Sequence, residues 1–268
     1  MKELITESRN ELINKIVRTV TLKQGDIAEM VSLYYDCQDL RIAHANKERT
    51  EPPSELVEWL DFWMKAGEKV IHAKLAQWVE GDDSPVEAKW AYDQVGIGPI
   101  IASGLAAHVD VAKADSISAL WKFAGQAPGF DRKVKGEKLA YNARLKVLCW
   151  KAGQSFCKVS GKENATYGKL YVQFKAEEIR KNEGGLYVEA AKRELEKKKF
   201  KQDDSVTKKR LLAGKLSDAH LHARATRRTV KLFLAHYYMV GREARGLPMR
   251  RPYAEQVLHH DGIIEPIR

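Results

Sequence analysis

The chain has 268 residues, of which 44% are hydrophobic, and its net charge is +10. This length allows one or two domains with a buried core, and the sequence has no apolar run long enough for a membrane-spanning helix. The first thirty residues show no signal-peptide pattern. The three cysteines, Cys37, Cys149 and Cys157, lack the CxxC spacing of metal sites. We therefore expect reduced thiols in a cytoplasmic protein.

The charge is divided unevenly along the chain. Residues 1–110 contain 12 basic and 19 acidic residues, whereas residues 111–268 contain 34 basic and 17 acidic residues. A basic half joined to an acidic half favours a polyanionic partner for the basic half. A solvated, lysine-rich surface is the alternative explanation.

Apolar residues at three- and four-residue steps predict helices over 2–22, 24–47 and 54–79. Pro52 and Pro53 separate the second helix from the third, and Ser54 is suited to cap the third. Two long helices with a short proline link form an antiparallel hairpin. Such a hairpin serves either as a dimer interface, in the manner of a coiled coil, or as ordinary packing within one subunit.

The rest of the chain is also expected to be mostly α, with no strand-rich segment and no internal repeat. A compact block covers 86–128, a basic loop covers 129–143, and a linker covers 202–205. Further helices are predicted over 142–159, 165–182, 184–200 and 219–241. We divide the chain into a helical hairpin (1–84), a helix-hairpin-helix domain (85–160), a basic helical extension (161–246) and a tail (247–268).

Residues 95–99 read VGIGP and separate two helical patterns. Glycine permits positive φ and close backbone approach, and Pro99 suits the first turn of a helix. We expect Ile97 to be buried and to fix the turn. The N–H groups around Gly96 and Gly98 would then bind phosphate without reading bases. A purely structural corner between two helices is the alternative.

Basic residues are the other candidates for nucleic-acid contact. They lie in the loop, at the start of the following helix, and at helical spacing near the C-terminus: Arg132, Lys133, Lys135 and Lys138; Arg144 and Lys146; Arg224, Arg227, Arg228 and Lys231. The sequence indicates no cofactor and no metal site, because His220 and His222 would diverge on a helix.

Three segments in this order resemble the C-terminal domain of the DEDD insertion-sequence transposases, relatives of the bridge-RNA-guided recombinases. They read VGIGPIIASGLAAHVD, ISALWKFAGQAP and KGEKLAYNARLKVLCWKAG. The resemblance covers residues 90–160. It implies a DNA-binding helix-hairpin-helix domain in a stand-alone protein of a phage or another mobile element, with a role in DNA recombination at the nucleoid.

Two departures from that family concern its chemistry. Residues 1–85 contain no apolar strand ending in Asp, with which the family's metal-binding RNase-H-like domain begins, and Asp36 and Asp39 fall in a helical pattern. The family's serine nucleophile is also missing, since residues 129–142 contain no serine and Lys135-Gly136 is the nearest match.

We therefore expect a homo-oligomeric protein that binds the backbone of DNA, with branched DNA among its ligands. We do not expect it to be a nuclease by itself. Two alternatives stay open. One is an active recombinase or nuclease whose catalytic residues are unrecognised, and the other is an RNA-binding or scaffolding module.

Overall fold

The computed structural model describes residues 11, 14, 15, 17–47, 55–127, 136, 138–197, 200, 205–249, 265 and 266. This part of the chain contains helices and turns but no strand, which confirms the predicted mostly-α fold. Its elements are η1 (Gln24–Asp26), α2 (Ile27–Lys47), α3 (Glu55–Glu80), α4 (Val86–Tyr92), α5 (Pro99–His108), α6 (Ile117–Phe123), α7 (Ala143–Lys158), α8 (Thr166–Glu183), α9 (Val188–Lys197), α10 (Val206–Leu212) and α11 (Asp218–Glu243). None of these helices is long and apolar enough to cross a membrane.

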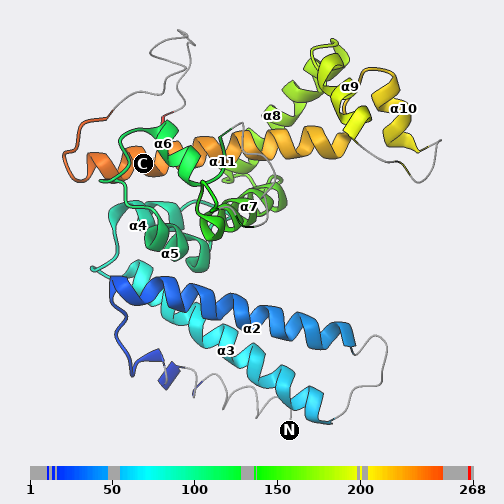
Figure 1. Cartoon of the computed structure of the whole chain (residues 1–268). Coiled ribbons are helices and arrows are strands. Elements are labelled where there is room, and N and C mark those ends of the chain that lie inside the picture. The colour runs from blue at the N-terminus through cyan, green and yellow to red at the C-terminus, as the bar shows by residue number, and fades with distance from the viewer. Residues whose placement is uncertain are drawn as a thin grey trace.

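Helices α2 and α3 form an antiparallel pair that projects from the rest of the molecule (Figure 1). Gly67 lies close to Cys37 Sγ across the pair, and Arg41 Nε donates to Glu68 Oε1 at 2.5 Å. Both helices contact α5, and Lys151 of α7 reaches Tyr35 and Gln38 of α2. Most of the predicted first helix, over 2–22, lies outside the described residues.

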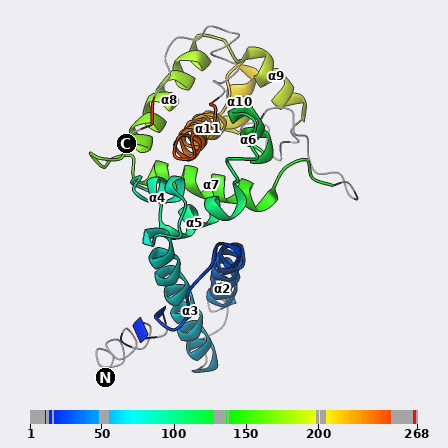
Figure 2. The ribbon, with the colours of Figure 1, turned by 90° about the vertical axis from the view of Figure 1, so that its left-hand side faces the viewer.

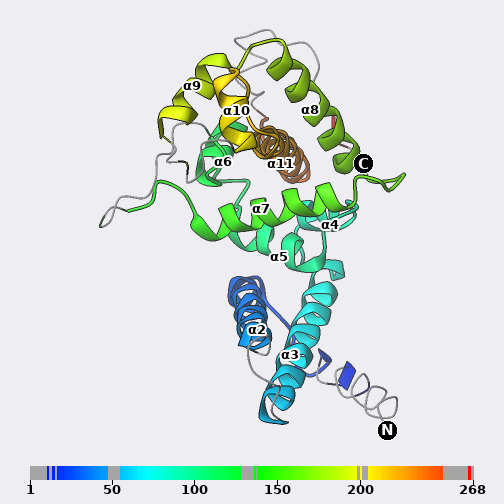
Figure 3. The same ribbon diagram turned by 90° about the vertical axis from the view of Figure 1, so that its right-hand side faces the viewer.

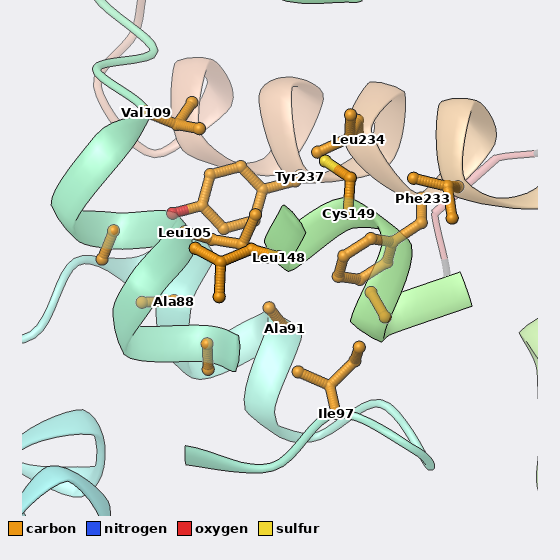
Figure 4. Close-up of a cluster of buried hydrophobic side chains, with 14 of the residues drawn as sticks. Ala88, Ala91, Ile97, Leu105, Val109, Leu148, Cys149, Phe233, Leu234 and Tyr237 are labelled. Atoms are coloured by element: carbon orange, nitrogen blue, oxygen red, sulfur yellow. The ribbon is translucent and has the colours of Figure 1, made fainter. Parts of the chain in front are cut away.

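The core of the body is built around α11. In Figure 2 this helix is seen end-on, with α6, α7 and α8 arranged around it. Phe233 of α11 stacks on Trp90 of α4 at a centroid distance of 5.7 Å and meets Phe156 of α7 edge-on at 5.2 Å. The close-up in Figure 4 shows the same core toward the end of α11, where Tyr237 lies among side chains of α5 and α7.

Helix α7 crosses α11 at very short range because Gly153 has no side chain. A Cβ at Gly153 would lie 2.5 Å from Thr226 Cγ2 and 3.0 Å from Val230 Cγ2, which is closer than packed carbon atoms approach. Helix α8 packs on another side of α11, where Tyr167 Oη and His236 Nδ1 lie 2.6 Å apart in a buried hydrogen bond. Residues from both sides of the predicted boundary at 160 therefore share one hydrophobic core.

Helices α9 and α10 form a small second core at the N-terminal end of α11 (Figure 3). Buried Asn182 of α8 anchors the chain there, because its Nδ2 donates to the Leu216 carbonyl and its Oδ1 accepts from the Leu216 N–H, at 3.2 and 2.9 Å. The sequence predicted one helix over 184–200, but α9 begins at Val188 after a turn in which Gly185 has a φ of 81°. Helix α10 was not predicted.

Replacing Asn182 by alanine should destabilise the protein by about 2 kcal/mol, because two buried main-chain groups of Leu216 would lose their partner. Urea unfolding followed by circular dichroism measures the change. Gln173→Ala, on the exposed face of the same helix, is the matched control and should change little. Equal stability of the two variants would contradict this role of Asn182.

Candidate nucleic-acid interface

The turn between α4 and α5 is held against α7. Gly96 has a φ of 104°, and a Cβ there would lie 3.1 Å from Val159 Cγ2. Ser155 Oγ donates to the Gly96 carbonyl at 2.5 Å. Ile97 is 4% exposed, as predicted. Packing therefore requires the glycine at position 96 and fixes the direction in which α5 begins.

Gly98 stands in a different environment. It precedes α5 with a φ of −89°, a conformation open to every residue, and a Cβ there would meet no atom within 4 Å. Pro99 follows as the first helical residue, while the Ile97 N–H is bonded to the Gln94 carbonyl at 2.9 Å. The described structure thus leaves open space in front of the α5 N-terminus. Packing alone gives no reason for glycine at position 98.

The predicted basic stripe of α11 divides into two pairs. Arg224 and Arg228 face α8, where Arg224 Nε donates to Glu178 Oε2 at 2.6 Å and Arg228 pairs with Glu177 at 2.5 Å. The Arg228 guanidinium also lies 3.9 Å from the centre of the Phe174 ring. These two arginines are therefore engaged in contacts that join α8 to α11.

Arg227 and Lys231 face the other way, toward α6. Lys231 Nζ lies 4.0 Å from the centre of the Trp121 ring, and Trp121 Nε1 donates to the Lys231 carbonyl at 2.8 Å. Burial, together with the nearby charge of Arg227, lowers the pKa of Lys231 below 10.5. Burial disfavours the charged ammonium, and the like charge of Arg227 adds to this effect.

The beginning of α7 lies against the end of α6. The Asn142 N–H donates to the Phe123 carbonyl at 2.8 Å, and Asn142 Oδ1 caps α7 by accepting from the Leu145 N–H at 3.0 Å. Gly125, with a φ of 64°, leaves room for Lys146, whose Nζ lies 4.2 Å from the centre of the Tyr141 ring. The close approach of these two segments brings Lys146 to the same side of the molecule as α6.

We refer to four basic residues on and beside this helix as the α6 basic surface: Lys122, Lys146, Arg227 and Lys231. Within the described parts of the chain, none of them forms a salt bridge. Two other predicted residues, Lys138 and Arg144, are exposed at and before the start of α7. Arg132, Lys133 and Lys135 lie outside the described residues.

An ion pair that the sequence did not predict joins the buried carboxylate of Glu87 in α4 to Arg245, a partly exposed residue after α11. Arg245 Nη1 and Nη2 donate to the two oxygens of Glu87 at 2.8 and 3.0 Å, and the Glu87 side chain is 3% exposed. The pair lines a cleft of about 970 Å³ between α4, α5 and α6. No sequence signal joins two residues 158 positions apart.

The other candidates for chemistry are accounted for by local contacts. His222 Nδ1 and Tyr171 Oη lie 2.8 Å apart, and the three cysteines form no disulfide. Burial raises the pKa of the Cys149 thiol to about 12. In the described residues, no group of three or more His, Cys, Asp and Glu side chains is arranged to hold a metal ion.

Comparisons with known proteins add no relative. No protein-family model matches the chain, and neither a curated protein nor a solved structure shows significant similarity to it. The resemblance to the transposase domain therefore stays a prediction that rests on the three sequence segments.

The two glycines of the turn should respond differently to substitution. Gly96→Ala should cost about 1–3 kcal/mol of stability, because alanine is strained at positive φ and its Cβ would press on Val159. Gly98→Ser should be neutral or slightly stabilising, because serine is a good helix N-cap. Urea unfolding of both variants measures these effects, and equal costs would contradict the separate roles.

The Glu178–Arg224 pair should make stability depend on acidic pH. Burial raises the pKa of Glu178, but hydrogen bonds from Arg224 and Tyr187 outweigh burial and bring it below 4.5. The stabilisation is therefore complete above pH 4.5 and is lost as the pH falls through the folded-state pKa.

Arg224→Met should cost about 2 kcal/mol at pH 7, because the buried carboxylate of Glu178 would lose its cationic partner and keep only the Tyr187 hydroxyl, while the partial exposure of Arg224 limits the loss. The difference in unfolding free energy between wild type and variant should become smaller below pH 4.5. Urea unfolding at pH 7 and at pH 3 measures this change. A deficit of the same size at both pH values would show that the charge pair is not its origin.

Proposed function

We propose that the protein binds DNA by its phosphate backbone, through the α6 basic surface and the turn before α5. The main support for this proposal is that the basic residues of α11 fall into two groups, one paired with acidic residues and one not. Arg224 and Arg228 are neutralised by glutamates of α8, whereas Arg227 and Lys231 lie beside Trp121 and carry a positive charge that no described carboxylate balances. Uncompensated basic side chains with aromatic neighbours suit a polyanion.

The open space before α5 supports the same partner. Helix N-termini favour anions, and Gly98 leaves that end accessible to a backbone phosphate. Backbone contacts of this kind do not select a base sequence, so we propose recognition of DNA by charge and shape, including branched DNA. The transposase-like assignment, with a role in recombination, rests on the sequence resemblance.

A homo-oligomer is also proposed, through the projecting α2–α3 pair. Trp59 and Trp63 of α3 are 57% and 50% exposed, and their rings lie 6.0 Å apart. Exposed aromatic groups at helical spacing are typical of contact surfaces between proteins.

The α6 basic surface is tested with Arg227→Gln/Lys231→Gln. Loss of two phosphate contacts should weaken binding to duplex DNA at least about tenfold and lower the slope of log K against log salt by about 0.9 per contact. Fluorescence anisotropy over a salt series measures both quantities.

Arg180→Gln/Lys169→Gln removes the same charges from the exposed face of α8 and is the matched control. The control should retain the wild-type affinity apart from a general loss of net charge. If both pairs weaken binding equally, the attraction is non-local and the α6 basic surface is not the binding site.

A further inference from the structure

The cleft beside the α6 basic surface has the dimensions and walls of a small-molecule site. Its volume of about 970 Å³ lies at the upper end of the range of ligand pockets, roughly 300–1,000 Å³. Small apolar side chains form much of its wall: Ala106, Ala107, Ala114 and Ala119. Phe123 stands among the lining residues and is 44% exposed. A flat, apolar group could pack against the alanine side chains and against the ring of Phe123.

The polar groups of the cleft suit an uncharged ligand. Its charged side chains carry no positive excess, because Arg245 pairs with Glu87, Lys113 pairs with Asp110, and Asp83 adds a further carboxylate. Burial, and then the charge of Arg144, lower the pKa of His108 below 6.5, so this imidazole is neutral at pH 7. Such a lining offers a phosphate no net electrostatic attraction. A neutral ring with hydrogen-bond donors and acceptors, in contrast, can form hydrogen bonds with it.

One polar group in the lining has no partner. Ser84 is 6% exposed, and its Oγ is buried without a hydrogen bond to any described residue. A buried hydroxyl without a partner is uncommon in folded proteins and costs free energy. The Ser84 oxygen has almost no exposed surface, so a bound group would reach it only after its side chain turns toward the cleft.

Helix α6 connects this cleft to the α6 basic surface. Ala119, Leu120 and Phe123 line the cleft, while Trp121 of the same helix lies against Lys231 and the next residue, Lys122, is exposed. Consider a DNA strand whose phosphates contact the α6 basic surface. Its bases would then lie within about 10–12 Å of the cleft, which is the diameter of one helix.

We infer that the cleft receives a single unpaired nucleobase of the bound DNA, with the sugar and phosphate left at the basic rim. This inference rests on the proposed DNA binding and adds a preference to it. A contact with the backbone alone favours duplex DNA, because its charge density is higher than that of a single strand. An unpaired base can leave the stack at little cost and enter a pocket.

The test compares a duplex that carries a one-nucleotide bulge with the same duplex lacking the bulge, by anisotropy at one salt concentration. The wild type should bind the bulged DNA about tenfold more tightly. Ala119→Trp fills the cleft from an exposed position and should abolish this preference without changing the affinity for intact duplex. Ser118→Trp, one residue earlier and outside the cleft lining, should retain it.

A photo-crosslinking readout locates the base directly. With 5-iodouracil at the bulge, irradiation should link the DNA to the peptide that contains Phe123. Equal binding of bulged and intact duplexes, a preference that survives Ala119→Trp, or a crosslink elsewhere would overturn the nucleobase site and leave DNA binding standing. Failure to bind either DNA would overturn both proposals.

Discussion

Helix α11 has to be covered along most of its length, and the rest of the body follows from that constraint. Its buried residues extend from Leu221 to Arg242, so α4, α6, α7 and α8 all pack against it. Three aromatic rings meet in this core, those of Phe233, Phe156 and Tyr167, with ring centres 4.9 to 5.2 Å apart. Offset and edge-on contacts of this kind stabilise a core beyond the area that they bury.

Covering α11 also determines which of its charges remain available. The side toward α8 places arginines against Glu177 and Glu178. On the side toward α6, the described contacts of Lys231 are with Trp121, whose ring lies under the Lys231 ammonium and whose Nε1 donates to the Lys231 carbonyl. The uneven charge of the two sides is thus a consequence of which helices pack on α11, and the proposed DNA contact uses the side on which Arg227 and Lys231 form no salt bridge with any described residue.

Much of the fold was predictable because long helices leave a strong periodic signal. The ranges 24–47 and 54–79 correspond closely to α2 and α3, and 219–241 to α11. Helix α10 is seven residues long and too short for such a signal. The burial of Ile97 followed from the pattern VGIGP, but the division of Arg224 and Arg228 from Arg227 and Lys231 did not, since helical spacing says nothing about the acidity of the neighbouring helices. The cleft joins residues far apart in sequence and required the tertiary structure.

Hydrogen–deuterium exchange of the full chain with and without bulged duplex DNA tests the central claim most directly, because it locates the contact without any substitution. We expect slower exchange in peptides that cover Ile97–Ala102 and Ile117–Ala127, and unchanged exchange in the exposed half of α3. Protection confined to α3 or to α9 and α10, with α5 and α6 unaffected, would contradict it.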